Sequence, residues 1–138
     1  MVELTRVYHF SAAHRLANPA LSAEQNAALY GDCHWPHGHN YYLEVTLGGR
    51  PHPVTGMAVD LGALDDAVRG GVLAHVDHRT LEEVPTLRGV VTTGEGLARA
   101  FWQVLAPTLP AGALRRVAVV ETAKNRFEYE GEARCSKS

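Results

Sequence analysis

A histidine pair at the start of an alternating stretch is the strongest constraint on how this chain folds. Residues 33–41 read CHWPHGHNY and hold three of the eight histidines. Over residues 41–47 every second residue is apolar, which predicts a half-buried β-strand. Residues two apart in a strand point to the same side, so His37 and His39 present two imidazoles to one point, with no side chain on Gly38 between them. Two such rings make half of a metal site, most often for zinc; two polar residues in a solvated loop are the alternative.

The composition narrows the class of protein. The chain has 138 residues, of which 46% are hydrophobic and 20% charged, and this favours one globular domain over residues 1–138. A net charge of −2 without a basic stripe argues against a nucleic-acid partner. The chain has no apolar run of membrane-spanning length and no secretion signal at its start. The two cysteines lie too far apart for a disulfide framework, so we expect a cytoplasmic protein with Cys33 as a free thiol and a polar, frayed tail over residues 131–138.

Periodicity and capping residues predict an α+β fold. We expect strands over about residues 2–10, 39–48, 57–59, 116–122 and 127–129. We expect helices to begin at a Ser22–Gln25 capping box, at Asp60, and at a Thr92–Glu95 capping box, the last helix covering about 94–106. Short antiparallel strands with two helices on one face leave the second face and the edges exposed, which predicts a homo-oligomer.

Three further positions combine reactive residue types with element ends. His14 follows the first strand and is either a metal ligand or a hydrogen-bonded histidine at a strand end. Asp77 and His78 follow the first long helix, where they form either a proton relay or a helix end with a favourable histidine. Glu121 lies among apolar residues, where an acid is rare without a cationic partner unless it points to water at the sheet rim.

Taken together, these motifs resemble a known family. The sequence carries, in order, FSAAHRL at 10–16, Cys33 with HGHNY at 37–41, PVTGM at 53–57, Asp77-His78, TTGE at 92–95, Glu121-Thr122 and YEGE at 129–132. Over nearly the whole chain this order is similar to the 6-pyruvoyl-tetrahydropterin and 6-carboxy-tetrahydropterin synthases. The resemblance implies a tunnelling fold, in which each subunit has a four-stranded antiparallel sheet with two helices on one face. It also implies trimers that close into barrels and pair as hexamers.

The resemblance also implies a role for each candidate residue. His14, His37 and His39 would bind zinc, and three protein ligands with an open fourth position are typical of a catalytic zinc site. The other implied roles are Cys33 as general base, Asp77 and His78 as a partner dyad from a neighbouring subunit, Glu121 as the anchor of the pterin ring, and Thr92 or Thr93 as a further contact to the ring. Arg15, Lys124 and Arg126 are candidates for binding the phosphates of the family's substrate, 7,8-dihydroneopterin triphosphate.

The two branches of the family differ in their product. The three residues between Cys33 and His37 resemble the 6-carboxy branch, which cleaves the side chain, releases acetaldehyde and triphosphate, and serves queuosine biosynthesis. The segments 26–33 and 53–57 instead resemble the 6-pyruvoyl branch, which eliminates triphosphate without cleavage. Gly94 departs from the Ser or Thr usual before the glutamate. We expect the 6-carboxy activity, because the spacer length shapes the catalytic loop directly.

A reading without catalysis stays open. The chain could be an oligomer that uses zinc only for folding. A structural zinc has four protein ligands, so Cys33 would then complete a set of three histidines and one cysteine, with a Zn–S distance of about 2.3 Å.

Overall fold

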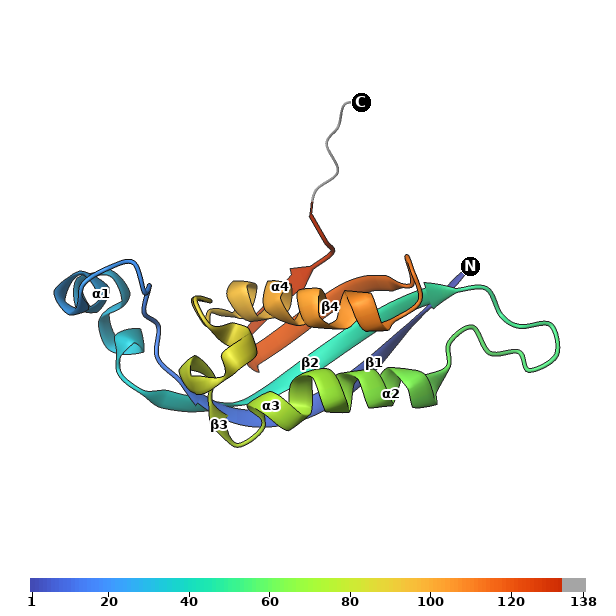
Figure 1. Cartoon of the computed structure of the whole chain (residues 1–138), viewed down its shortest axis with the longest axis horizontal. Helices are drawn as coiled ribbons and strands as arrows, with labels where there is room; N and C mark the ends of the chain where they lie inside the picture. Colours follow the sequence, from blue (N-terminus) through green and yellow to red (C-terminus); the bar gives the residue numbers. More distant parts are fainter. Residues whose placement is uncertain (133–138) are drawn as a thin grey trace, which may run out of the picture.

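The computed structural model describes residues 1–132, in which one sheet carries five strands (Figure 1). The strands are β1 (Val2–His14), β2 (His37–Gly49), β3 (Arg79–Thr80), β4 (Leu114–Thr122) and β5 (Asn125–Tyr129). Their order is β3-β1-β2-β4-β5. The four long neighbours pair antiparallel, and the two-residue strand β3 adds parallel to the outer edge of β1. The expected four-stranded antiparallel sheet is therefore present, with one short strand added at its edge.

The long helices cover one face of this sheet, and four α-helices are present in the described residues. They are α1 (Ala23–Tyr30), α2 (Leu61–Val68), α3 (Ala74–Val76) and α4 (Gly94–Leu105), and a π turn over Arg69–Leu73 joins α2 to α3. Figure 1 shows α2 and α4 lying across the sheet, with α1 at one end of the molecule and the loop before α2 at the other. Leu61, Leu64, Val68, Val72 and Val76 are the apolar positions that the sequence predicts on one face of the first long helix; the last four are almost completely buried, and Leu61 is half-buried. The predicted α+β class is confirmed.

Two of the three predicted helix caps are confirmed. Ser22 and Gln25 form a complete capping box at α1, and the Asp60 carboxylate accepts the Ala63 N–H at α2. The third is wrong by one residue, because Thr93 caps α4 by accepting the Gly96 N–H. Because α4 begins at Gly94, Thr92 lies one residue before the cap, and its hydroxyl donates a hydrogen bond to Glu82 at 2.6 Å.

The predicted strand over residues 57–59 is also wrong. These residues belong to the loop before α2. Both edges of β2 are already paired, with β1 on one side and β4 on the other, so no edge of β2 is open to a returning hairpin strand. The loop instead closes on itself, where His52 N–H donates to the Met57 carbonyl at 2.9 Å.

β1 and β2 extend further towards the histidines than the sequence predicts. β1 continues to His14 and β2 begins at His37, so all three histidines of interest lie inside strands.

Of the predicted frayed tail, Glu132 accepts hydrogen bonds from Tyr129 and Arg99, whereas residues 133–138 lie outside the described part. Within residues 1–132, every helix is too short or too polar to cross a membrane.

Gly94 at the start of α4 provides a test of this packing. A Cβ atom added there would lie 1.9 Å from the ring of Phe127 on β5, whereas one added at Gly70 would meet nothing within 4 Å. We expect Gly94→Ala to lower the free energy of unfolding by about 1–3 kcal/mol, the usual cost of overpacking. Gly70→Ala is the matched control and should be neutral or stabilising.

The measurement is denaturant unfolding of both variants and of Gly94→Ala combined with Phe127→Ala. Removing the ring should relieve most of the effect of the added methyl group. A Gly94→Ala protein as stable as the wild type would show that α4 and β5 do not approach this closely.

Candidate functional site

The register between β1 and β2 brings three imidazoles together. His14 lies directly opposite His37, and His39 lies opposite Ala12. Side chains two apart share a face, so the rings of His14, His37 and His39 all point to the helix-covered side.

The three rings are close enough to bind one metal ion. Each histidine offers a nitrogen, and these atoms all lie within 4.8 Å of one another. The ring centroids of His14 and His37 are 4.5 Å apart, those of His14 and His39 are 5.0 Å apart, and those of His37 and His39 are 4.9 Å apart. Within residues 1–132, no other group of three or more histidine, cysteine or acidic side chains brings its ligand atoms this close together.

Backbone carbonyls fix the tautomers of two rings. The carbonyl oxygen of Thr92 lies 2.9 Å from His14 Nδ1, and that of Trp35 lies 2.7 Å from His37 Nδ1. A carbonyl can only accept, so each Nδ1 carries the proton and each Nε2 keeps its lone pair for a metal.

Two ring nitrogens that lack a hydrogen-bond partner are a further indication of a metal site. His14 Nε2 and His39 Nε2 are buried without a hydrogen-bond partner, which is rare for buried polar nitrogen. Three neutral imidazoles with a free coordination position are the donor set of a catalytic zinc site.

Burial favours the neutral form, which binds metals, for two of the rings. Desolvation, and then the nearby His37, lowers the pKa of His14 from 6.5 to about 4. Burial also lowers the pKa of His39. A metal competes with protons for these nitrogens, so a low pKa favours the metal near neutral pH.

Cys33 lies outside this group. It is an exposed free thiol in the short 3₁₀ turn Gly31–His34, and its backbone carbonyl accepts the Leu16 N–H at 2.8 Å. The turn is thus attached to the chain just after His14. Cys33 does not join the three histidines as a fourth ligand, which leaves the structural-zinc reading without geometric support.

Asp77 and His78 form a pair at the outer edge of β1. Asp77 Oδ1 accepts from the Ser11 N–H at 3.0 Å and lies 3.0 Å from His78 Nδ1. The Ser11 N–H, and to a lesser degree His78, lowers the pKa of Asp77. His78 adopts a φ of 59°, a backbone conformation that is unusual for a residue with a side chain and is often found at functional sites.

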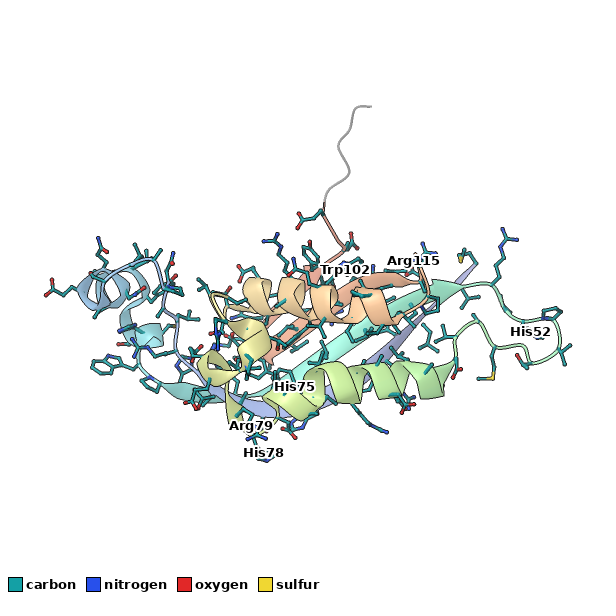
Figure 2. The ribbon with its side chains drawn as sticks, viewed as in Figure 1. His52, His75, His78, Arg79, Trp102 and Arg115 are labelled. Atoms are coloured by element: carbon teal, nitrogen blue, oxygen red, sulfur yellow. The ribbon has the colours of Figure 1, made fainter. Side chains whose placement is uncertain are left out.

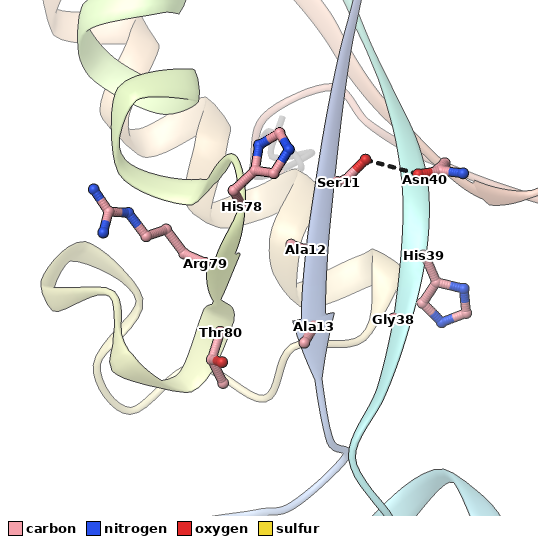
Figure 3. A pocket seen from close by; sticks show the side chains of 9 residues that line it. All are labelled: Ser11, Ala12, Ala13, Gly38, His39, Asn40, His78, Arg79 and Thr80. Carbon is pink, nitrogen blue, oxygen red and sulfur yellow. Dashed lines mark hydrogen bonds between the residues drawn. The ribbon is translucent and has the colours of Figure 1, made fainter.

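This pair and the histidine group lie apart within one chain. His78 projects into solvent with an 83% exposed side chain, on the same side of the molecule as His75 and Arg79 (Figure 2). Figure 3 shows the His78 ring beyond the edge of β1 and the His39 ring on the far side of β2. Ser11, Ala12 and Gly38 line the 500 Å³ depression between them.

A β-bulge presents Glu121 to the histidine group. The pairing of β4 with β5 shifts between Val120 and Thr122, and such an extra residue re-aims its side chain. Glu121 Oε1 lies 3.8 Å from His39 Nε2, and the carboxylate helps to raise the pKa of Tyr41, chiefly a consequence of burial. Glu121 therefore faces the site rather than open solvent, and within residues 1–132 no Lys or Arg pairs with it.

Apart from Lys124, the side chains of the remaining candidates are already engaged in hydrogen bonds or ion pairs. Thr92 is 1% exposed and contacts His14 and Glu82, while Thr93 caps α4. Arg126 pairs with Glu44 and Glu128, Arg15 donates to the His34 ring at 2.9 Å, and Lys124 is exposed in the β4–β5 turn. The sequence did not indicate the acceptors of Thr92, Trp35 and Glu82, because backbone carbonyls carry no side-chain signal and Glu82 resembles any surface acid.

Comparisons with known proteins place the chain in a family. The family model described as 6-pyruvoyl tetrahydropterin synthase matches residues 3–132. A 6-pyruvoyl tetrahydrobiopterin synthase from Poecilia reticulata is 42% identical, over 94% of this chain and 90% of that protein. The Homo sapiens protein of the same name is 40% identical, over 94% and 92%. The structure of Caenorhabditis elegans 6-pyruvoyl tetrahydropterin synthase superimposes with a TM-score of 0.88 at 38% identity, covering 95% of this chain and 96% of that one.

The chain therefore belongs to the 6-pyruvoyl tetrahydropterin synthase family of pterin synthases. The expected tunnelling fold is confirmed at the level of the subunit. Proteins named 6-carboxy-5,6,7,8-tetrahydropterin synthase are also similar but match less well. The one from Aquifex aeolicus is 29% identical over 94% of this chain, and the one from Rickettsia bellii is 35% identical over only 56%.

The lowered pKa of His14 predicts a pH dependence of stability for the metal-free protein. The unfolded chain takes up this proton near pH 6.5 and the folded chain only near pH 4. The group therefore has no effect above about pH 6.5, and the free energy of unfolding falls as the pH is lowered from 6.5 towards 4.

Denaturant unfolding of metal-free protein over this pH range measures the effect. His14→Gln has no titrating ring at this position, so its stability should depend less steeply on pH. Equal slopes for the two proteins would show that His14 is not held neutral by the fold.

Proposed function

We propose that this protein is a zinc-dependent 6-pyruvoyl-tetrahydropterin synthase that eliminates triphosphate from 7,8-dihydroneopterin triphosphate. The observation that carries the proposal is similarity over nearly the full length of proteins with that name, at 40–42% identity, in a chain whose three histidines converge. The 6-carboxy activity expected from the Cys33–His37 spacer has weaker support, because the relatives with that name match at lower identity or over a shorter stretch.

His14, His37 and His39 would hold the zinc through the nitrogens that face one another. When bound, zinc supplies a Lewis acid that lowers the pKa of substrate hydroxyl groups. The burial that lowers the pKa of His14 keeps that ring neutral and ready to coordinate.

Cys33 and the Asp77–His78 pair would move the protons. Cys33 is an exposed thiol in a turn tied to the end of β1, so it is accessible to a substrate at the metal. Asp77 accepts from His78 Nδ1, which leaves His78 Nε2 free to take or give a proton. General acid–base groups of this kind typically contribute about 10²–10⁴-fold to a rate.

Glu121 would anchor the pterin ring. Its carboxylate is mostly buried and faces the histidine group without a Lys or Arg partner in the described residues. A carboxylate can accept two parallel N–H bonds from a pterin, which orients the ring as well as binding it.

The proposal includes a homo-oligomer. The His78 ring lies beyond the β1 edge of the β1–β2 pair and the His39 ring beyond the β2 edge (Figure 3), so a neighbouring subunit would have to supply the dyad. Exposed Val7 and Tyr42 on the uncovered face of the sheet also favour assembly. We expect a hexamer of two trimers, located in the cytoplasm, where Cys33 stays reduced.

Product analysis with 7,8-dihydroneopterin triphosphate tests the function. We expect release of triphosphate and accumulation of a 6-pyruvoyl product with all three side-chain carbons attached. Acetaldehyde together with a 6-carboxy-tetrahydropterin would instead establish the activity that the spacer indicates. Zinc-loaded protein that forms neither triphosphate nor a new pterin would support the non-catalytic reading. Cys33→Ala is the control, because it should keep its zinc and lose turnover by about 10²-fold or more.

A further inference from the structure

Glu82 lies beside the histidine group and has no role in the proposed reaction. It belongs to the short 3₁₀ turn Leu81–Glu83, which follows β3 along the outer edge of β1. Both oxygens of its carboxylate are engaged. Oε1 accepts the backbone N–H of Arg15 at 3.1 Å, and Oε2 accepts the hydroxyl of Thr92 at 2.6 Å.

Thr92 connects this carboxylate to His14. The Thr92 carbonyl oxygen lies 2.9 Å from His14 Nδ1, and the Thr92 hydroxyl oxygen lies 3.3 Å from the same atom. Thr92 and His14 are each 1% exposed, so water does not compete for these bonds. Arg15 immediately follows His14, and its N–H contact to Glu82 therefore holds the same point of the backbone.

The direction of the Thr92 hydroxyl gives Glu82 its influence. An ionised carboxylate can only accept, so the hydroxyl proton must point at Glu82 and the oxygen lone pairs are left for the His14 Nδ1–H. This arrangement gives the Nδ1–H a second acceptor beside the Thr92 carbonyl, and the two acceptors together keep the lone pair on Nε2, the nitrogen that faces the other histidines. Carboxylates that act on a ligating histidine in this way fix its ring and increase its basicity.

We propose that Glu82 is a positioning residue for the metal centre, acting through Thr92 to hold His14 in the tautomer and orientation that bind the ion. This inference rests on the zinc of the proposed function, but not on which pterin product is formed. Glu82 is not one of the converging ligand residues, and its hydrogen bonds lead to them through Thr92 and His14.

Zinc affinity, measured by competition with a chromophoric chelator, tests the proposal. Glu82→Gln keeps the size of the side chain, but its amide would donate to Thr92 and turn the hydroxyl proton away from the carboxamide. We expect a loss of about 10–100-fold in zinc affinity, the usual effect of removing such a partner. Thr92→Val removes the hydroxyl and keeps the carbonyl, and it should cause a similar loss. The zinc affinity of the double variant should be no lower than that of the more affected single variant, because both substitutions interrupt one chain of hydrogen bonds.

Glu83→Gln is the matched control. Glu83 lies in the same turn, and within residues 1–132 its side chain makes no hydrogen bond or ion pair. Its zinc affinity should equal that of the wild type. Circular dichroism and the thermal midpoint of each metal-free variant show whether it is folded, and the visible spectrum of the Co²⁺-loaded protein reports the geometry at the metal. We expect Glu82→Gln and Thr92→Val to alter that spectrum and Glu83→Gln to leave it unchanged.

Folded Glu82→Gln with wild-type zinc affinity and Co²⁺ spectrum would overturn the inference and leave the proposed function intact. If the losses of zinc affinity in the two single variants add up in the double variant, the proposed route through Thr92 is wrong. A wild-type protein that binds no zinc would overturn both the inference and the zinc-dependent function. If zinc affinity follows the expected pattern but the product is a 6-carboxy-tetrahydropterin, the inference stands and only the proposed branch is wrong.

Discussion

The antiparallel pairing of β1 with β2 determines the site more than any other interaction. It runs from Val2 opposite Gly49 to His14 opposite His37 without a shift. Below the histidines, Phe10 and Tyr41 stack at a centroid distance of 4.7 Å and fix the same register from the core. A slip of one residue would turn His37 and His39 to the other face while His14 stayed in place. The long ladder therefore gives the histidine group its geometry.

The site carries a stability cost that a bound metal would offset. His14 Nε2, His39 Nε2 and the Tyr41 hydroxyl are three of the four buried side-chain atoms in residues 1–132 that lack a hydrogen-bond partner. Each such atom usually costs about 1–3 kcal/mol. Their concentration at one end of the sheet indicates a functional requirement, because packing alone would favour apolar residues there. A ligand that binds only the folded state returns part of this free energy.

The sequence predicts the frame of the site better than its details. The alternation in residues 41–47, the cap at Asp60 and the stripe of Leu64 and Val68 are local signals, and they were sufficient for the main elements. The same-face geometry of His37 and His39 follows from strand parity alone. The missed features depend on contacts between distant segments. Thr93 caps α4 while the Thr92 hydroxyl binds Glu82 from a distant turn, and residues 57–59 stay a loop because β4 occupies the edge of β2. The product branch does not follow from such local signals either, since a three-residue spacer fixes the length of a loop but not the position of the Cys33 thiol.

The central claim is that three histidines, without Cys33, form an open metal centre. X-ray absorption at the zinc edge of the zinc-loaded protein tests this most directly. The structure predicts a first shell of nitrogen and oxygen atoms only, at about 2.0–2.1 Å, with three imidazole ligands. A sulfur atom at about 2.3 Å would contradict the claim, because it would make Cys33 a ligand and the site a closed structural one.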